Sequence, residues 1–465
     1  MPRPSKLSMV RLELLLSQQG PISAPELAAE MGVDATTVTR AIGRMGERVA
    51  SIGATRRTRY LLRKPILREE SKFGIFRIAP DGQAALWGEL ECFHGGWRFQ
   101  WVGSPPRWAD RFHDADGLWR EMPFFLTDVT PQGFLGRGIA SKLAQGCDVP
   151  SDPSLWADAH RLLYLQGFGD DVPGDLVVGE AALRRAISRR LDSSDELRFP
   201  PHMAIQKYPG FVETLVPHPP PGPPLSGEQP KFAVILQDPG EVRPMIVKFS
   251  PPVAQPAGRR WADLLTMESH AHKLLARAGL GRDGTRIIDA GGRRFLEIPR
   301  FDRSPEGGRM PSVSLFSLHR AATGRTEGDW VSRALDLEKA GLIDAATLVR
   351  IRKLHAFAEL VGSSDRGAGN LSFHWDDEGF QLAPAYDILP MHWAPGPQGE
   401  LAERRFSPEL PAPASREAWL EMLPLAREFW SAVIADQRIS RDFAATARAA
   451  GEVLARLAEA AGATS

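Results

Sequence analysis

Residues Gly362-Ser-Ser-Asp-Arg-Gly-Ala-Gly-Asn370 and Ala385-Tyr-Asp-Ile388 are the two stretches that decide how this 465-residue chain is interpreted. Asp365 and Asn370 stand in the first stretch, and Asp387 stands in the second. A carboxylate can accept the proton of a substrate hydroxyl, while an amide oxygen and a second carboxylate can bind Mg²⁺ beside phosphate groups. The order Asp, Asn, Asp therefore favours phosphoryl transfer, although each residue alone is also a common turn or helix-capping residue.

The residues around these stretches predict a helix, a loop and a hairpin. Apolar residues at helical spacing predict a helix over 348–361, which stops at a glycine. Alternating apolar residues predict a strand over 371–375, and a return strand follows over 380–383. The hairpin would carry the chain from Asn370 back to Asp387, so that both side chains reach one site.

A lysine and a glutamate farther up the chain extend this pattern. The sequence predicts strands over 232–236 and 244–249 and a helix over about 259–278. Lys248 lies near the end of the second strand, and Glu268 lies in the apolar stripe of the helix. A carboxylate on a buried face is costly unless it is paired, and Lys248 is the obvious partner. Protein kinases hold ATP phosphates with such a pair, while a structural salt bridge explains the pattern equally well.

From about residue 70 onward the sequence resembles the HipA-family serine/threonine kinases, the toxins of type II toxin–antitoxin systems. The branch it resembles carries an extra N-terminal helix-turn-helix (the YjjJ or HipH type). The resemblance rests on SGEQPK (Ser226–Lys231), MIVK (Met245–Lys248), RFDR (Arg300–Arg303), SSDRGAGN (Ser363–Asn370) and AYDI (Ala385–Ile388). It implies a two-lobed protein-kinase fold that uses ATP and Mg²⁺.

The resemblance also implies a role for each site residue. Asp365 would be the catalytic base, and Asn370 and Asp387 would bind Mg²⁺. The hinge against adenine would be the segment Glu297–Phe301, which includes Arg300. Contacts to the ATP phosphates would come from the loop residues Gly227, Glu228, Gln229 and Lys231 and from Lys248, which Glu268 would pair.

Three departures from the family bear on activity and regulation. Gly367 and Gly369 stand where the family's catalytic loop usually carries His and Lys, with Arg366 as a candidate substitute cation. Pro224 stands where many members have a regulatory serine, so Ser226 is the nearest candidate for autophosphorylation. The chain has its own predicted DNA module, so a conventional separate antitoxin is not assumed.

The formal net charge of zero, from 57 basic and 57 acidic residues, hides an uneven distribution. Residues 1–65 hold eleven Lys/Arg against five Asp/Glu, so this segment carries +6 and the remaining 400 residues carry −6. Such asymmetry is typical of a nucleic-acid-binding module, although a solvated basic terminus would look the same.

Capping residues and periodicity predict a winged helix-turn-helix in the same segment. Helices are expected over 9–18, from Ser23 to Gly32, and from Asp34 to about Val49, with a hairpin over 49–62. The third helix would enter the DNA major groove and the wing would contact phosphates. The candidate DNA-binding residues are Thr36, Thr37, Arg40 and Arg44 on the helix and Arg56 and Arg57 in the wing. A protein-interaction module or a degenerate winged helix is the alternative.

The fold class predicted from these features is multidomain α+β. We expect a winged helix-turn-helix over 1–66 and a small β-rich subdomain over 67–150. The kinase N-lobe region would cover 151–303, with a Pro-rich linker over 217–224, and a helical C-lobe would cover 304–465. The longest apolar stretches are shorter than the ~20 residues of a membrane span, and the two cysteines are too few for a disulfide framework, which favours a cytoplasmic protein with no membrane partner.

The leading functional hypothesis is an ATP/Mg²⁺-dependent protein serine/threonine kinase that binds DNA through residues 1–66. By resemblance, its protein substrate belongs to the translation machinery, for example an aminoacyl-tRNA synthetase, and phosphorylation arrests growth. The alternative is a DNA-binding transcriptional regulator whose kinase-like body senses a nucleotide with little or no transferase activity. A small-molecule phosphotransferase is a third and weaker option.

Overall fold

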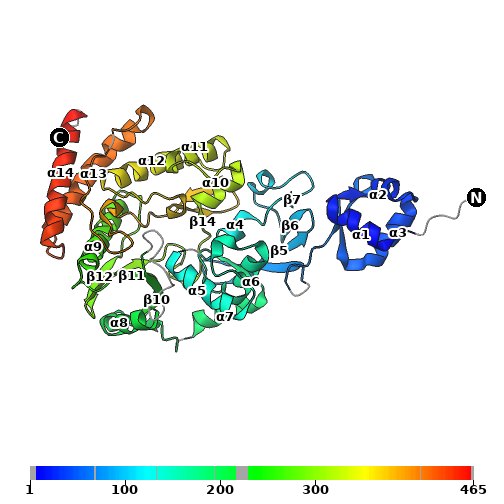
Figure 1. The fold of residues 1–465 in the computed structure, drawn as a ribbon, viewed down its shortest axis with the longest axis horizontal. Coiled ribbons are helices and arrows are strands. Elements are labelled where there is room, and N and C mark those ends of the chain that lie inside the picture. Colours follow the sequence, from blue (N-terminus) through cyan, green and yellow to red (C-terminus); the bar gives the residue numbers. More distant parts are fainter. Residues whose placement is uncertain are drawn as a thin grey trace, which may run out of the picture.

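The computed structural model describes residues 7–67, 70–131, 133–192, 194–215, 229–408 and 410–461. The protein has an α+β fold, in which a small N-terminal module lies at one end and the helices α13 and α14 lie at the other (Figure 1). No helix in these ranges is long and apolar enough to cross a bilayer.

The N-terminal module consists of three helices and a three-stranded sheet. Its helices are α1 (Met9–Gln18), α2 (Ala24–Met31) and α3 (Ala35–Met45), and its antiparallel sheet has the order β1 (Ile22–Ser23), β3 (Arg59–Leu62), β2 (Val49–Ile52). Both predicted N-caps are present, because Ser23 and Glu26 form a capping box and Asp34 accepts a bond from the Thr37 amide at 2.8 Å. The prediction that the third helix reaches Val49 is wrong. It ends at Met45, since Gly46 adopts φ +56° and a 3₁₀ turn follows.

The middle region is built on an antiparallel sheet. Its order is β7 (Leu118–Trp119), β6 (Gly96–Trp101), β5 (Ala84–Phe93), β4 (Lys72–Ile78), β8 (Leu176–Val178). Its helices are α4 (Phe124–Thr127), α5 (Gly133–Gly146), α6 (Asp158–Phe168) and α7 (Glu180–Leu191). Strand β8 comes from beyond residue 150 and pairs with β4, so the segment after that predicted boundary belongs to the same sheet.

A second five-stranded sheet carries Lys248. Its order is β12 (Arg286–Ala290), β13 (Arg293–Pro299), β11 (Glu241–Phe249), β10 (Lys231–Asp238), β9 (Arg198–Phe199). Helix α8 (Ala204–Leu215) packs on one face through Tyr208 and Val212. Helix α9 (Pro256–Arg277) packs on the opposite face, where its Leu265 contacts Leu296 of β13. Side chains alternate along the strands, so Lys248 lies on the α9 face.

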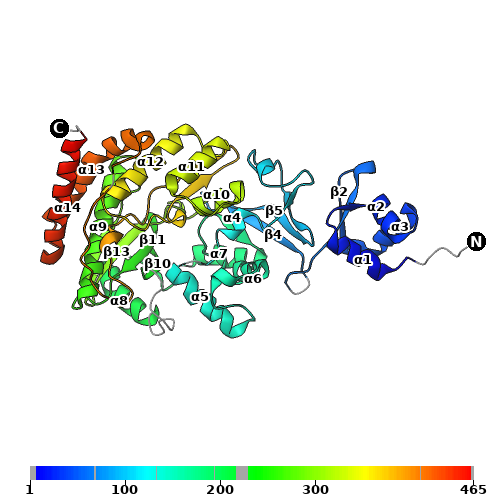
Figure 2. The same ribbon diagram turned by 45° about the horizontal axis from the view of Figure 1, so that its top comes forward.

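The C-terminal region combines helices with a short sheet that leads to the AYDI stretch. The helices are α10 (Leu315–Thr323), α11 (Trp330–Lys339), α12 (Ala345–Leu360), α13 (Arg416–Ala435) and α14 (Arg441–Ala460). The sheet has the order β14 (Val313–Ser314), β15 (Ser372–Trp375), β16 (Phe380–Leu382). One continuous apolar core joins these helices to the middle region, which agrees with the close packing of the two parts in Figure 2.

Candidate functional site

The centre of the site is Lys248, which lies between two carboxylates from different parts of the chain. Its side chain is 3% exposed, and its Nζ donates to Glu268 Oε1 of α9 at 2.5 Å and to a carboxylate oxygen of Asp387. Burial opposes the charge of the ammonium group, but the two carboxylates outweigh burial and raise the pKa of Lys248. The predicted pair of Lys248 with Glu268 is therefore present, and Asp387 joins it.

Asp387 is held in an unusual backbone conformation. Its φ of +54° lies in the left-handed region, which non-glycine residues adopt at a cost. Two residues earlier, Ala385 donates its amide to the carbonyl of Leu280 after α9 at 3.0 Å, which fixes the chain there. Burial alone would raise the pKa of the Asp387 carboxyl, but the Lys248 and Lys231 ammonium groups lower it overall. The fold thus keeps an ionised carboxylate beside Lys248.

The loop after α12 carries Asp365 and Asn370. Asp365 is exposed, and Asn370 closes a 3₁₀ turn (Ala368–Asn370) in which its Nδ2 donates to the Asp365 carbonyl at 3.2 Å. This bond uses the nitrogen of the Asn370 side-chain amide and not its oxygen, which is the atom that a metal ion would bind. The loop therefore links the candidate base to the candidate metal ligand through one hydrogen bond.

The two glycines that depart from the family pattern have fixed backbones. Trp330 Nε1 of α11 donates to the Gly367 carbonyl at 2.9 Å, and the Tyr386 hydroxyl donates to the Gly369 carbonyl at 2.7 Å. Burial raises the pKa of Tyr386, so its hydroxyl stays protonated as a donor. Neither Trp330 nor Tyr386 was predicted as a site residue. The only indication in the sequence was the position of Tyr386, which directly precedes Asp387 in the AYDI stretch.

Arg366 does not face the site as a substitute cation. Its Nη1 donates to the Ser363 carbonyl at 3.2 Å, and its Nη2 lies 3.6 Å from a carboxylate oxygen of Glu359. Both contacts hold the guanidinium against the end of α12. The positive charges beside Asp387 come instead from Lys248 and Lys231.

The predicted phosphate loop is described only at its end. Lys231 pairs directly with Lys248 across β10 and β11, and Gln229 is buried, with an Nε2 that donates no hydrogen bond to the described residues. Ser226, Gly227 and Glu228 lie outside the described residues, as does Pro224. The structure therefore brings Lys231 close to Lys248 and Asp387.

The three predicted hinge residues point in different directions. The Phe301 ring stacks on Tyr386 with centroids 5.2 Å apart, which places it beside Asp387. The Arg300 guanidinium instead contacts Asp302 and Asp171. The Glu297 side chain lies on the α8 face of the sheet, where it accepts bonds from Tyr208 at 2.6 Å and Arg286 at 2.7 Å. Of the three side chains, the structure brings only that of Phe301 to the site.

Two of the predicted site residues carry oxygen donors that suit a Mg²⁺ ion. Mg²⁺ prefers carboxylate and amide oxygens and usually keeps waters and substrate phosphates as further ligands. Asp387 and Asn370 supply these two donor types. No group of three or more His, Cys, Asp or Glu able to hold a metal occurs in the described part of the chain. The donor set thus fits an ion that is shared with a nucleotide better than a closed structural metal site.

The candidate DNA-binding residues lie on the outer side of the N-terminal module. Thr36, Arg40 and Arg44 are exposed on α3, opposite the buried Val38 and Ile42. The Thr37 hydroxyl is engaged by Asp34 at 2.6 Å as part of the helix cap. Arg57 is exposed, whereas the side chain of Arg56 is outside what the structure describes. The module therefore offers one exposed helical face with Thr and Arg side chains.

Comparisons with known proteins define the class of this chain. Residues 224–463 match the sequence family described as the HipA-like C-terminal domain, and residues 69–187 match the YjjJ-like toxin middle domain. The chain is therefore a HipA-like toxin of α+β fold. It is 32% identical over 451 residues to Toxin YjjJ of Escherichia coli (strain K12), a match that covers 96% of this chain and 97% of that one. The chain belongs to the YjjJ branch of the HipA-like toxins.

Two further similarities are more distant. The putative kinase Y4mE of Sinorhizobium fredii is 24% identical over 174 residues, which is 36% of this chain and 41% of that protein. The HipA chain in a complex of Shewanella oneidensis HipA, HipB and operator DNA has a TM-score of 0.53 at 14% identity, covering 83% of this chain and 97% of that chain. This structural likeness supports the HipA-like fold. The match to the middle domain runs across the predicted boundary at residue 150.

Proposed function

We propose that this HipA-like toxin is an ATP/Mg²⁺-dependent protein serine/threonine kinase that carries its own DNA-binding module. The observation that carries the proposal is the buried contact of Lys248 with both Glu268 and Asp387. A lysine paired with a helix glutamate, next to an aspartate from a later loop, is the arrangement that protein kinases use at ATP phosphates. The resemblance to the serine/threonine kinases of the HipA family supports the choice of a protein hydroxyl as acceptor.

Each side chain then has a chemical role. Lys248 and Lys231 would bind the phosphate oxygens of ATP, and Phe301 would lie beside the adenine. Asn370 and Asp387 would hold Mg²⁺, which when bound neutralises charge on the β- and γ-phosphates. Asp365 would accept the proton of a serine or threonine hydroxyl as its oxygen bonds to the γ-phosphorus. The bond from that phosphorus to the bridging oxygen breaks, and ADP leaves.

A phosphate-transfer assay tests this proposal. The full-length protein is incubated with γ-labelled ATP and Mg²⁺, alone and with cell lysate. Transfer of label is expected for wild type and should fall by at least about 10²-fold in Asp365→Asn, because the general base is lost. Asp377→Asn, which changes an exposed acid in the β15–β16 turn, is the matched control and should keep full transfer. Nucleotide binding by wild type without transfer to any protein would contradict the kinase proposal.

The alternative is a DNA-binding regulator that senses a nucleotide. Gly367 and Gly369 favour it, because they remove the two side chains that the family usually carries near the γ-phosphate. In this case wild type would bind ATP with the same affinity as Asp365→Asn and transfer no label. The phosphoproteome of cells that express wild type or Asp365→Asn would identify the substrate, for which an aminoacyl-tRNA synthetase is the proposed class.

The DNA-binding part of the proposal rests on the exposed Thr36, Arg40 and Arg44 of α3. In the Shewanella oneidensis complex the HipA chain is accompanied by HipB and operator DNA. We propose that residues 1–66 of this chain contact DNA directly, and a separate antitoxin is not required for that contact. A helix in the major groove with arginines toward DNA would release counterions from the phosphates.

A gel shift in the full-length protein tests this contact. Arg40→Ala and Arg44→Ala should each weaken binding and lower its salt dependence by about one counterion where the arginine contacts a phosphate. Arg184→Ala changes an exposed arginine on α7 of the middle region and serves as the matched control. Equal DNA affinity in all four proteins would show that α3 is not the DNA-binding helix.

A further inference from the structure

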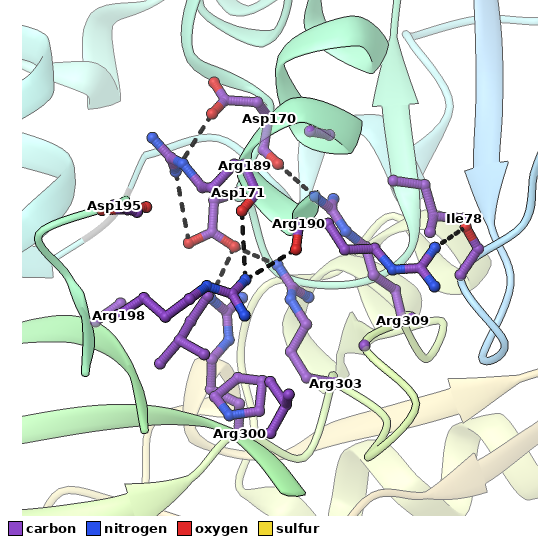
Figure 3. Close-up of a pocket in the computed structure, with 18 of the residues that line it drawn as sticks. Ile78, Asp170, Asp171, Arg189, Arg190, Asp195, Arg198, Arg300, Arg303 and Arg309 are labelled. Carbon is purple, nitrogen blue, oxygen red and sulfur yellow. Dashed lines mark hydrogen bonds and ion pairs between the residues drawn. The ribbon is translucent and has the colours of Figure 1, made fainter. Parts of the chain in front are cut away.

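A cavity of about 190 Å³ lies apart from the candidate kinase site. It is enclosed by α7 of the middle region, the outer half of the β10–β11 hairpin and the segment 300–309 (Figure 3). Arginines line it from three separate parts of the chain: Arg189, Arg190, Arg198, Arg300, Arg303 and Arg309. The volume is smaller than the roughly 300 Å³ at which drug-sized pockets begin, so a ligand here would be small.

The floor of the cavity holds three guanidiniums, two of which share a pair of carboxylates. Arg303 donates to Asp171 at 2.7 Å and to Asp302 at 2.7 Å, and Arg300 donates to the same two carboxylates. These contacts consume both carboxylates and leave Arg309, the third buried guanidinium, without one. Arg309 as a whole is only 6% exposed. The buried Asp170 also lines the cavity, but its carboxylate pairs with Arg185 and Arg189, and it gives Arg309 only its backbone carbonyl.

Arg309 lacks one hydrogen bond as well as an ion pair within the described residues. Its Nη2 donates to the backbone carbonyl of Asp170, while its Nη1 has no hydrogen-bond partner among the described residues. Burial and the neighbouring charge of Arg303 lower the pKa of Arg309 to about 9. A buried cation of this kind is costly unless an anion accompanies it. Within the described residues Arg309 forms no direct ion pair, and the more distant carboxylates of Asp171, Asp175 and Asp302 stabilise its charge only in part.

Two more arginines at the cavity bond to neutral groups. Arg190 donates to the carbonyls of Gly82 and Asp81, and Arg198 donates to Gln237 and to the carbonyls of Arg189 and Arg190. The Nε of Arg198 is buried and has no hydrogen bond within the described chain. These bonds fix the two guanidiniums in place without an ion pair, although the carboxylates of Asp195 and Glu306 also line the cavity.

Part of the remaining wall is apolar. Ile187 of α7 and Leu197 before β9 are each 38% exposed, and Val242 and Pro244 of β11 continue the same lining. Exposed aliphatic side chains beside fixed guanidiniums suit a ligand with an apolar body and an anionic head. An inorganic ion alone would use only the arginines.

The cavity is separated from the candidate nucleotide site by the hinge. Arg300 and Phe301 are adjacent, and the Arg300 side chain contacts Asp171 while the Phe301 ring stacks on Tyr386. Along β11, Pro244 of the cavity lining precedes Lys248 by four positions, which corresponds to about 13 Å in a strand. The two sites therefore share a sheet but lie on different sides of the hinge segment.

We propose that this cavity binds a small phosphate monoester whose organic part is apolar or aromatic. A phosphate dianion offers three equivalent oxygens with two charges, and several planar guanidiniums can bond to them at once. A carboxylate offers two oxygens and a single charge, which matches Arg309 alone and leaves Arg190 and Arg198 without an ion pair. The site goes beyond the proposed kinase activity, since it involves none of the residues assigned to the ATP phosphates, to Mg²⁺ or to phosphoryl transfer.

Calorimetric titration of the full-length protein tests the proposal. Phenyl phosphate is the probe, inorganic phosphate and benzoate are the comparisons, and a saturating non-hydrolysable ATP analogue fills the nucleotide site. Phenyl phosphate should bind in the presence of the analogue at least tenfold more tightly than either comparison. If benzoate binds as tightly as phenyl phosphate, the choice of a phosphate ligand is wrong. If phenyl phosphate no longer binds once the ATP analogue is present, its binding belongs to the nucleotide site and the proposal is overturned.

Variants connect the binding to the cavity. Arg309→Met should abolish binding of phenyl phosphate, and Arg198→Gln should weaken it at least tenfold. Arg184→Gln, on the exposed side of α7, should leave it unchanged. Should Arg309→Met fail to fold, the double variant Arg190→Gln/Arg198→Gln decides the matter, because both side chains lie at the wall. Unchanged affinity in that variant, or in a folded Arg309→Met, would overturn the proposal.

Discussion

Lys248 is the residue on which the stability and the proposed chemistry of the site both depend. Its ammonium group is buried between Glu268 and Asp387, and Glu268 Oε2 has no hydrogen bond from the described residues. Glu268 itself is fully buried on α9. Removing the lysine would leave that fully buried carboxylate without its cation, which is costly.

Lys248→Met should therefore lose both activity and stability. We expect phosphate transfer to fall by at least about 10²-fold, and the free energy of unfolding to fall by about 3–5 kcal/mol, because a buried ion pair loses one member. Urea unfolding and the labelled-ATP assay measure the two effects.

The double variant Lys248→Met/Glu268→Leu separates the two roles of the lysine. It removes the stranded carboxylate and should recover most of the lost stability, because an apolar pair replaces a buried ionic one. Phosphate transfer should stay absent. Recovery of transfer would show that Lys248 serves packing only.

The sequence was sufficient to predict the pair of Lys248 with Glu268 but not its third member. Glu268 interrupts an apolar stripe only 20 positions from Lys248, and a buried carboxylate needs a cation. The contact with Asp387 spans 139 positions and depends on the left-handed backbone at that residue, which local patterns do not report. The cavity arginines were missed for the same reason, since α7, β9 and the segment 300–309 meet only in the folded chain.

Arg309 gives the protein a specific pH dependence. Its pKa is lowered to about 9 by burial and by the neighbouring Arg303 and Arg300, with Asp171 and Asp302 opposing them. Between about pH 9 and pH 12 the unfolded chain keeps a proton that the folded protein has released, so stability rises with pH in this window. Measured against Arg309→Met by urea unfolding, wild type should gain about 1 kcal/mol between pH 8 and pH 10. A constant difference between the two proteins would contradict this expectation.

At the scale of elements, an aromatic cluster attaches the β15–β16 hairpin to the middle region. Trp375 of β15 lies 5.3 Å from Trp87 and 5.6 Å from Trp108, measured between ring centroids. The Arg77 guanidinium lies 4.6 Å above the Trp375 ring, and Trp108 Nε1 donates to the Asp376 carbonyl at 2.8 Å. The hairpin that connects Asn370 to Asp387 is therefore positioned from outside the kinase-like region.

Trp375→Ala should destabilise the protein by about 3–5 kcal/mol, because a buried indole leaves a cavity among other aromatic rings. It should also reduce phosphate transfer, since β15 follows Asn370 directly. Trp375→Phe should retain most of both properties. Val102→Ala, at an exposed apolar residue of the same region, should change the free energy of unfolding by less than about 0.5 kcal/mol. Thermal unfolding and the labelled-ATP assay measure the set, and normal transfer in Trp375→Ala would show that the hairpin needs no external support.

The elements themselves were largely predictable where the signals are local. The capping box at Ser23, the helix over 9–18 and the strands before and after the turn at 376–379 agree with the structure. Helix α8 contains Pro209, a residue that argues against a helix interior, and it was not predicted. Its packing of Tyr208 against the sheet overrides that local preference.

At the scale of the whole molecule, the N-terminal module, with its net charge of +6, contacts the rest of the chain, with its net charge of −6, at a buried glutamate. Glu91 of β5 is fully buried, and Arg98 donates to it at 2.6 Å. Arg63, which follows β3 of the module, donates to the other carboxylate oxygen. Burial would raise the pKa of Glu91, but the two arginines lower it overall. The backbone also continues across the junction, because the Lys64 amide donates to the Cys92 carbonyl at 3.0 Å.

Glu91→Gln should loosen the module from the body without unfolding either part. The substitution keeps the shape of the side chain but leaves Arg63 and Arg98 beside a neutral amide. Removing one member of a buried ion pair costs about 3–5 kcal/mol, and here this cost weakens the contact between the module and the rest of the chain. The module has its own apolar core of α1, α2 and α3, so it should stay folded and keep its DNA affinity. The loss should therefore appear as faster trypsin cleavage between residues 63 and 72, by at least about tenfold, since cleavage follows the open population of the linker. Glu89→Gln, two residues earlier on β5, provides the comparison. If Glu91→Gln and Glu89→Gln release the N-terminal fragment at the same rate, then the apolar contacts of Ile52 and Leu61 with Phe93 hold the junction and the buried charge does not.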